Sequence, residues 1–316
     1  MHQDSLPQLD RLFLTDAGLE TDLIFNHGVD LPCFASIALL RNESGREVLR
    51  DYFRQYLSLA AGHRLGLVLE SASWRASPDW AAPLGLTGEE LDALNLASIE
   101  LLKDLREEFA SSGIPIVVSA CMGPRGDGYD PGQIMSLAEA EQYHSHQAHV
   151  LASAGPDMLS AFTINNLNEA IGVTRAAART GLPFALSFTV ETDGRLPTGD
   201  ALGAAIEAVD AATDSYPAYY MINCAHPTHF DGVLEEGAAW VTRIQGIRAN
   251  ASRCSHAELD AMTELDAGDP QDLAVHYRNL RTRLPQLNVL GGCCGTDHRH
   301  VEAIAKECLP LEASAA

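Results

Sequence analysis

Eight short apolar segments recur along the chain, and longer segments with helical periodicity separate them. The apolar segments are rich in Val, Ile, Leu and Phe, and their hydrophobicity is continuous rather than alternating. Continuous hydrophobicity is typical of strands that are covered on both faces, as in a parallel sheet. We expect these strands at residues 12–14, 65–69, 114–119, 158–163, 184–190, 219–223, 240–246 and 288–290.

The segments between the expected strands carry helix start patterns. Thr87 with Glu90, and Ser136 with Glu139, have the spacing of capping boxes, in which each side chain satisfies a backbone N–H of the first helical turn. We expect helices near residues 46–62, 88–110, 137–153, 167–179, 200–213, 228–236, 271–283 and 298–308.

Eight strands that alternate with eight helices over 316 residues predict an α/β fold, a single (β/α)8 TIM barrel that covers residues 1–316. A doubly wound sheet is the alternative, but it needs a glycine-rich phosphate-binding turn after its first strand. Residues 15–21 lack that fingerprint. We find no Pro/Ser-rich linker and no low-complexity block, which favours one domain.

The chain is strongly acidic, with 43 Asp and Glu against 21 Lys and Arg and a formal net charge of -22. Such a charge repels phosphate backbones and anionic lipids, so we expect no nucleic acid and no membrane as partners. No apolar run approaches the roughly 20 residues of a membrane-spanning helix, and the first residues do not resemble a signal peptide. We therefore expect a cytoplasmic protein.

The seven cysteines are odd in number and scattered, which indicates a reducing compartment rather than a disulfide framework. Cys224 ends an expected strand, and Cys293 and Cys294 lie on a glycine-flanked turn after the last strand. In a TIM barrel the carboxyl ends of the strands meet at one mouth. Three thiolates there could hold Zn²⁺ and leave a fourth position for substrate, whereas buried cysteines can also be small apolar side chains.

Six motifs carry a resemblance to a known family, namely Asp-Ala-Gly-Leu-Glu-Thr at 16–21, Glu-Ser-Ala-Ser-Trp-Arg-Ala-Ser at 70–77, Ser-Ala-Cys-Met-Gly-Pro at 119–124, Ser-Phe-Thr at 187–189, Asn-Cys at 223–224 and Gly-Gly-Cys-Cys-Gly-Thr at 291–296. With these motifs the chain resembles the homocysteine S-methyltransferases over nearly its whole length. That family consists of zinc-dependent TIM barrels and includes betaine-dependent enzymes and the homocysteine-binding modules of methionine synthases.

The resemblance implies roles for individual residues. Cys224, Cys293 and Cys294 would be the zinc ligands and the catalytic residues. A carboxylate at Glu70 could meet an ammonium or onium charge, although pairing with Arg75 is the competing explanation. The expected substrate-binding residues are Asp16, Gly18, Thr21, Glu70, Ser71 and Asn223.

One position departs from the family pattern. The family usually has an acidic residue after the fourth strand, seven positions before a Glu-Ala pair, and this residue helps to hold the homocysteine amino group. Counting back from Glu169 and Ala170 leads to Phe162, which cannot pair with an ammonium group. Either Asp16 or Glu70 then takes over this task, or the acceptor is a different thiol.

The resemblance implies an enzyme that moves a methyl group from an onium donor, such as S-methylmethionine, S-adenosylmethionine or a betaine, to homocysteine, giving methionine. An aliphatic thiol has a pKa near about 8.5 and is mostly protonated at neutral pH, whereas zinc binds it as the thiolate. Because the donor leaves as a neutral molecule, no general acid is needed. Aromatic faces suit a cationic methyl group, and packed barrel aromatics are the competing explanation for Trp74, Trp80, Tyr129 and Trp240.

Three alternatives remain. The same zinc site could methylate a different small thiol, or the barrel could be a binding module for a separate corrinoid or folate protein. A zinc hydrolase on the same barrel would use metal-bound water, but three sulfur ligands donate charge and raise the pKa of that water. The identity of the donor and the oligomeric state do not follow from the sequence.

Overall fold

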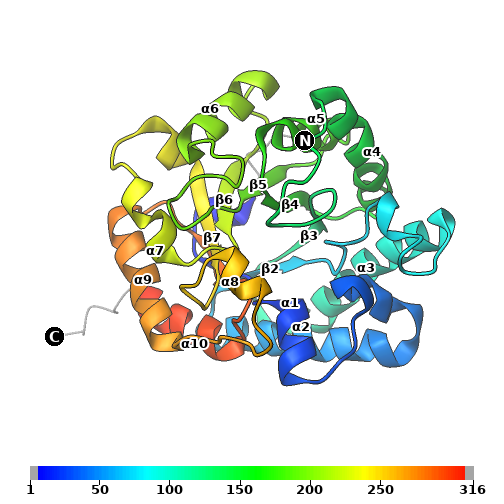
Figure 1. The fold of residues 1–316 in the computed structure, drawn as a ribbon. Coiled ribbons are helices and arrows are strands. Elements are labelled where there is room, and N and C mark those ends of the chain that lie inside the picture. Colours follow the sequence, from blue (N-terminus) through cyan, green and yellow to red (C-terminus); the bar gives the residue numbers. More distant parts are fainter. Residues whose placement is uncertain (1–5, 310–316) are drawn as a thin grey trace.

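The computed structural model describes residues 6–309 and contains a closed barrel of eight parallel strands in chain order (Figure 1). This confirms the predicted TIM barrel, whereas the single domain over residues 1–316 includes segments outside the described ones and stays a prediction. The strands are β1 Phe13–Leu14, β2 Gly66–Glu70, β3 Ile116–Met122, β4 Met158–Ile164, β5 Phe184–Phe188, β6 Tyr219–Asn223, β7 Ile244–Ala249 and β8 Val289–Gly292.

The barrel closes between its first and last strands. Phe13 of β1 pairs with Gly66 of β2 on one side and with Val289 of β8 on the other. The strand β1 is only two residues long, yet both of its edges are occupied. Closure therefore leaves none of the eight strands with a free edge, which is the usual way in which a barrel avoids edge pairing with other chains.

Helices surround the barrel, as Figure 1 shows. The capping boxes predicted at Thr87 and Ser136 are present, and they begin two of the long helices. No helix among residues 6–309 is long and apolar enough to cross a membrane. The helices are α1 Leu19–Thr21, α2 Glu43–His63, α3 Gly88–Glu108, α4 Leu137–Ser153, α5 Leu167–Ala178, α6 Leu202–Thr213, α7 Pro227–Phe230, α8 His256–Asp260, α9 Pro270–Arg283 and α10 His298–Cys308.

Two expected elements are wrong. The seventh strand was expected at 240–246, but β7 runs from Ile244 to Ala249 and Trp240 lies in the preceding 3-10 turn. The Trp240 ring packs against Gly203 of α6, so this apolar side chain is buried in the outer layer of helices and not in a strand. The expected helix at 228–236 ends at Phe230, because a short 3-10 turn and glycines follow it.

The core has two layers because successive strand residues point to opposite faces. Phe13, Val68 and Met158 fill the interior of the barrel, whereas Leu14 and Leu67 pack outward against the helices. Toward the carboxyl ends of the strands the interior becomes polar, and the buried side chains there include Glu70, Ser119, Ser160, Ser187, Asn223 and Arg248. This change of polarity marks the mouth at which a site would lie.

Candidate active site

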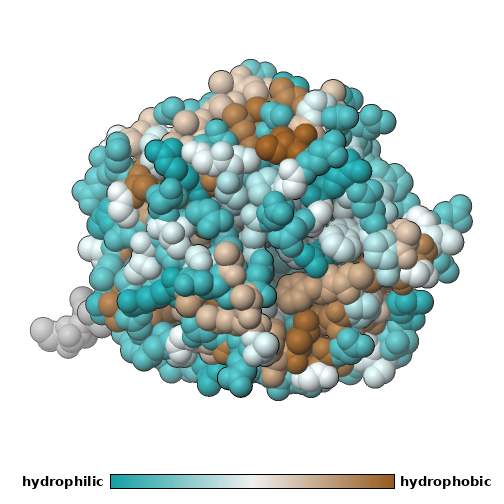
Figure 2. Space-filling view, viewed as in Figure 1, coloured by the Kyte–Doolittle hydropathy of each residue, from teal (hydrophilic) through white to brown (hydrophobic). Residues whose placement is uncertain are grey.

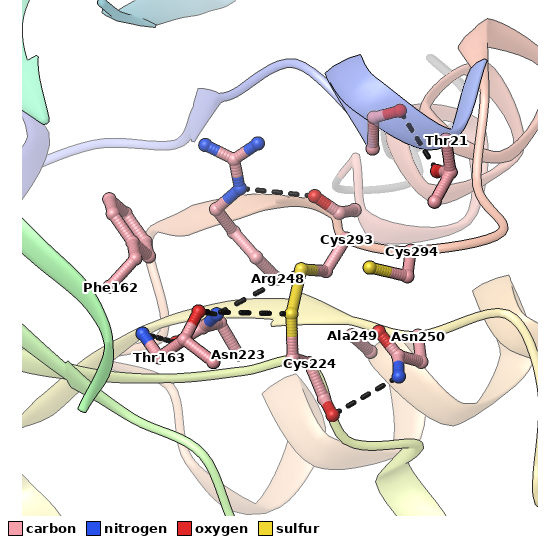
Figure 3. Close-up of a disulfide and its surroundings, with 12 residues drawn as sticks. Thr21, Phe162, Thr163, Asn223, Cys224, Arg248, Ala249, Asn250, Cys293 and Cys294 are labelled. Atoms are coloured by element: carbon pink, nitrogen blue, oxygen red, sulfur yellow. Dashed lines mark hydrogen bonds between the residues drawn. A yellow bond between two sulfur atoms is a disulfide. The ribbon is translucent and has the colours of Figure 1, made fainter. Parts of the chain in front are cut away.

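The three cysteines singled out in the sequence lie together at this mouth. The Sγ atoms of Cys224, Cys293 and Cys294 are all within 4.8 Å of one another. Figure 3 shows that Cys224 and Cys293 are joined by a disulfide and that the Cys294 sulfur points toward them. The disulfide differs from the expectation of free thiols, which rested on a cysteine count that carries no information about which sulfurs become neighbours.

The backbone around Cys224 is unusual and well anchored. Cys224 has a φ of 54°, in the left-handed region that side-chain-bearing residues rarely adopt. Its N–H donates to the Arg248 carbonyl over 3.1 Å, and its own carbonyl accepts from Asn250 Nδ2 at 3.1 Å and pairs with a ring nitrogen of His256 at 2.7 Å. The strained turn aims the sulfur across the mouth toward β8, as expected when strain is held at a functional position.

Gly18 brings the first loop against the cysteine turn. A Cβ atom at this position would collide with the Cys293 carbonyl and with the Thr21 hydroxyl. The Thr21 hydroxyl accepts a hydrogen bond from the Gly295 N–H at 3.2 Å, which ties the two loops together. Only glycine permits this approach, so the family motif at 16–21 has a physical reason to contain it.

The side-chain amide of Asn223 helps to position the sulfurs of Cys293 and Cys224. Asn223 Oδ1 accepts from the Thr163 N–H at 2.9 Å and from the Ser187 hydroxyl at 2.6 Å. With its oxygen so occupied, Asn223 directs its Nδ2 to Thr163 Oγ1 at 2.9 Å and to Cys293 Sγ at 3.8 Å. The Thr163 hydroxyl in turn lies 3.9 Å from Cys224 Sγ. The sulfurs therefore receive hydrogen bonds from a network whose geometry is fixed by β4, β5 and β6.

Charged side chains occupy the opposite side of the mouth. Arg248 Nη2 lies 2.8 Å from Asp16 Oδ1, and the Tyr52 hydroxyl donates to Asp16 Oδ2 at 3.2 Å. Glu70 Oε2 accepts from the Ser160 hydroxyl at 2.6 Å. Burial raises the pKa of both carboxyl groups above its ordinary value, although Arg248 acts in the other direction.

Arg248 also lies over an aromatic ring. Its Cζ atom is 5.2 Å from the centroid of Phe162, the residue that stands where the family usually has an acid. Its Nε donates to the Gly292 carbonyl at 3.0 Å and its Nη2 donates to the Ala17 carbonyl at 2.8 Å. Burial alone would lower the pKa of Arg248, but Asp16 and Glu70 together raise it, so the guanidinium is charged.

All nine predicted site residues line a single inner cavity of about 90 Å³. A wider outer cavity of about 360 Å³ adjoins it, and Cys224, Cys294 and Trp74 line both. Figure 2 shows this face of the molecule, with apolar residues gathered below and to the right of its central hollow and smaller apolar patches among the hydrophilic residues elsewhere. Two connected spaces with sulfur between them can accept two different small molecules.

The four candidate aromatics separate into two groups. Trp74 lines both cavities and Tyr129 lines the outer one, whereas Trp80 and Trp240 line neither. The alternative pairing of Glu70 with Arg75 does not occur, because Arg75 donates to the Cys33 carbonyl at 2.7 Å and its guanidinium lies over the Trp74 and Trp80 rings.

A second group of possible metal ligands lies outside these cavities. One ligand atom from each of His226, Asp272 and His276 falls within 4.8 Å of the others. Arg253 Nη2, however, lies 3.3 Å from His276 Nε2 and forms an ion pair with Asp272. A guanidinium therefore already supplies the positive charge that a metal ion would bring to this group.

Sequence reasoning missed Arg248, Thr163 and Ser160. Arg248 follows Ile247 in an apolar run, and this pattern could have indicated an inward-facing charge if β7 had been placed correctly. Thr163 and Ser160 are ordinary hydroxyl residues on a strand, and nothing in their spacing distinguishes them from other buried hydroxyls. Their contributions depend on which neighbour they meet across the barrel.

Comparisons with known proteins agree over nearly the whole chain. The homocysteine S-methyltransferase family model matches residues 13–308. Homocysteine S-methyltransferase 1 of Arabidopsis thaliana is 23% identical over 96% of both chains, and homocysteine S-methyltransferase 4 of Zea mays is 27% identical over 93% of this chain and 88% of its own. Selenocysteine Se-methyltransferase of Brassica oleracea var. italica is 24% identical over 93% of this chain and 88% of its own.

Solved structures share the fold. The homocysteine methyltransferase MmuM from Escherichia coli superimposes in its oxidized form with a TM-score of 0.73 and in its metallated form with 0.70. Each alignment has 22% identity and covers 96% of this chain and 97% of MmuM. The family match over nearly all of the described residues, together with these relatives, identifies the chain as a methyltransferase that belongs to the homocysteine S-methyltransferase family.

Proposed function

We propose that this enzyme is a zinc-dependent S-methyltransferase that moves a methyl group from an onium donor to the sulfur of homocysteine and gives methionine. The observation that carries the proposal is the cluster of three cysteine sulfurs within 4.8 Å of one another between two cavities. In this proposal the inner cavity takes the acceptor thiol and the outer cavity takes the donor.

The donor set fits the metal. Thiolate ligands of one tetrahedral Zn²⁺, each about 2.3 Å from the ion, place their sulfurs within the spread found here. Cys224 and Cys293 would have to be reduced from the disulfide to two thiols before they could serve with Cys294 as ligands. The proposal therefore places the enzyme in the cytoplasm, where thiols stay reduced. Bound Zn²⁺ would hold the acceptor sulfur as its thiolate at neutral pH.

The residues around the sulfurs would keep the reacting groups aligned. Asn223 and Thr163 donate hydrogen bonds toward Cys293 and Cys224, and these bonds restrict the sulfurs to one arrangement. Gly18 permits the close approach of the first loop to the cysteine turn, and this contact would help to exclude water from the inner cavity that both line. Alignment and exclusion of water are the contributions that an in-line methyl transfer needs from a protein.

The outer cavity has the chemistry of a cation site, which supports an onium donor. The aromatic rings of Trp74 and Tyr129 line it together with the carboxyl groups of Asp127, Asp260 and Glu264, which outnumber the one guanidinium there, Arg75 over the Trp74 ring. Aromatic faces and carboxylates both attract a positively charged methyl donor. The three donors that we consider are S-methylmethionine, S-adenosylmethionine and a betaine.

The proposal is tested by metal analysis of the reduced protein and by a methylation screen of onium donors against thiol acceptors. We expect about one zinc per chain and methionine formation from homocysteine with at least one donor. Cys224→Ala should lose both zinc and activity. Cys254→Ala, which removes a free cysteine that lines neither cavity, should keep both. Failure with homocysteine across every donor would reject the proposal.

A second candidate, methylation of a different small thiol, is favoured by one observation. Phe162 lies where the family usually has the acidic residue that holds the amino group, and its side chain is buried against Arg248. The acceptor arm of the screen therefore includes thiols that lack an amino group. Turnover of such thiols without turnover of homocysteine would replace the first candidate with the second.

A further inference from the structure

Glu70 is a buried carboxylate without a direct ion pair, although Arg248 lies near enough to act on its pKa. It is 6% exposed, lines the inner cavity and accepts a hydrogen bond from the neutral Ser160 hydroxyl. Among residues 6–309 it forms no ion pair. Buried carboxylates are usually paired, because the loss of hydration is costly unless a cation replaces it. Glu70 therefore has the properties of a group that receives its cation from a ligand.

Arg248 lines the same cavity and has one guanidinium nitrogen that is not used by the protein. Its Nε is used by the Gly292 carbonyl, and its Nη2 is used by the Ala17 carbonyl and by Asp16. Within the described part of the chain, Nη1 has no hydrogen-bond partner. A guanidinium that is held on two sides and free on the third is preorganised to bind a carboxylate.

Phe162 explains why Arg248 stays available. The ring lies beneath the guanidinium, with 5.2 Å between the Arg248 Cζ atom and the ring centroid, and it is 5% exposed. An acidic side chain at this position would form an ion pair with Arg248 and occupy its free nitrogen. The aromatic ring instead supports the guanidinium from below and leaves its charge for a ligand.

Asp16 is already neutralised by its own partners. Its two carboxylate oxygens meet Arg248 at 2.8 Å and the Tyr52 hydroxyl at 3.2 Å. Of the two acids that the sequence singled out, Asp16 and Glu70, only Glu70 therefore lacks an ion pair; Glu20, which also lines the inner cavity, accepts a hydrogen bond from the Ser36 hydroxyl at 2.6 Å.

We propose that Glu70 and Arg248 bind the acceptor as a zwitterion, with the ammonium group at Glu70 and the carboxylate at Arg248, so that the acceptor is an α-amino-acid thiol. This inference rests on the proposed function, because it assigns the charged end of the molecule whose sulfur reacts at the cysteines. The acid that binds the ammonium group is then Glu70 on β2 instead of a residue on β4. The carboxylate of the acceptor is bound by Arg248 on β7. The inner cavity of about 90 Å³ contains both charged groups and the three cysteines, which suits a small amino acid.

The proposal predicts selectivity rather than loss of activity alone. Homocysteine is compared with two analogues, one without its amino group and one without its carboxylate. Glu70→Gln should lower kcat/KM by about 10- to 100-fold for acceptors with an amino group and leave the deamino analogue unaffected. Arg248→Met, which also removes the contacts with Gly292, Ala17 and Asp16, should lower kcat/KM by about 10- to 100-fold more for acceptors with a carboxylate than for the decarboxylated analogue.

The chain offers matched controls. Arg243 resembles Arg248 because it pairs with Asp210 at 2.9 Å and lies 5.3 Å from the Tyr220 ring, but it precedes β7 at the other end of the barrel. Arg243→Met should not change the ranking of homocysteine and its two analogues by kcat/KM. Glu169, a buried carboxylate paired with His144, is the control for Glu70, and Glu169→Gln should likewise leave the order unchanged.

Binding of methionine provides a readout that does not depend on turnover or on a fully active variant. Methionine and its deamino and decarboxylated analogues are titrated into the wild type and into Arg248→Lys, Arg248→Met and Glu70→Gln, with calorimetry as the measurement. The wild type should bind methionine at least about 10-fold more tightly than either analogue. Arg248→Lys, which keeps the charge, should retain more of the preference for the carboxylate than Arg248→Met.

The outcomes separate this inference from the proposed function. If methionine is formed but the two analogues react as well as homocysteine in every variant, the zwitterion site is wrong and the methyl transfer stands. If the binding preference follows Glu70 and Arg248 but no thiol is methylated by any donor, the zwitterion site stands and the proposed function is wrong. Equal binding of methionine and both analogues by the wild type would overturn the inference directly.

Discussion

The hydroxyl of Tyr129 donates a hydrogen bond to the Cys294 sulfur over 3.6 Å. The Tyr129 ring is fixed for this task, because it stacks on the His256 ring with 3.8 Å between the centroids. His256 in turn pairs with the Cys224 carbonyl at 2.7 Å. One loop residue is thus coupled to the cysteine turns of both β6 and β8.

Tyr129→Phe should weaken zinc binding by about 10-fold, because hydrogen bonds to ligand atoms commonly change metal affinity by this order. The phenyl ring can keep its stack on His256, so the variant tests the hydroxyl alone. Competition with a zinc-chelating dye on the reduced protein measures the effect. Tyr143→Phe, which removes a hydroxyl that contacts Ser77 outside both cavities, is the control and should bind zinc like the wild type.

The protein should bind about one zinc per chain rather than two, because Arg253 occupies the second group of possible ligands. His276→Ala should therefore leave the zinc content unchanged, whereas Cys294→Ser should lower it. Elemental analysis of the reduced and dialysed variants measures both. Two zinc ions per chain, one of them lost in His276→Ala, would contradict the prediction.

Glu70→Gln should become more stable relative to the wild type as the pH rises from about 4.5. Burial raises the pKa of Glu70 above its ordinary value of 4.5, so the folded protein binds this proton more tightly than the unfolded chain does. The stability of the wild type therefore falls as the pH rises from 4.5 to the raised folded pKa, where the loss is complete, and glutamine avoids that cost. Urea unfolding of the reduced, metal-free proteins at several pH values measures the difference.

Glu90→Gln provides a control with the opposite sign. The backbone N–H and the side chain of Thr87 hydrogen-bond to the Glu90 carboxylate and hold its pKa below the ordinary value. Its contribution to stability is therefore present above pH 4.5 and is lost as the pH falls through the lowered pKa. A pH-independent difference for Glu70→Gln would contradict the burial argument.

Tyr277→Phe should lower the free energy of unfolding by about 1–3 kcal/mol. The buried Tyr277 hydroxyl accepts from the Ala249 N–H at 2.8 Å and donates to the Gly291 carbonyl at 2.5 Å, so it joins the ends of β7 and β8. Its removal leaves both backbone groups without that partner. Urea unfolding measures the change, and Tyr216→Phe, at a partly buried hydroxyl, should cost less.

The barrel could be predicted because the sequence patterns that indicate its strands and helices each span only a few residues. Continuous apolar runs indicate strands covered on both faces, and the capping patterns at Thr87 and Ser136 mark helix starts through contacts three residues apart. The seventh strand failed because Trp240 and its neighbours are also apolar. Trp240 packs against α6 in the outer layer. An apolar run in the sequence does not show whether its residues belong to a barrel strand or to the segment before it.

The candidate site could be predicted in part. The rule that strand ends converge was enough to bring Cys224 and Cys293 together, because both directly follow strands. The disulfide between them and the stacking of Arg248 on Phe162 could not be predicted, since both depend on the stagger of strands around the ring. A departure from the family pattern at Phe162 indicated a changed pocket without indicating the residue that compensates.

The pairing of β1 with β8 has a consequence for folding during synthesis of the chain. The loop that carries Gly18 is synthesised well before Cys293, the residue that it contacts. A nascent chain therefore has no enclosed sulfur cluster until its final strand has been synthesised and docked. Any ion that the three sulfurs hold could bind only after that step, and fragments that stop short of β8 would leave one edge of β1 unpaired.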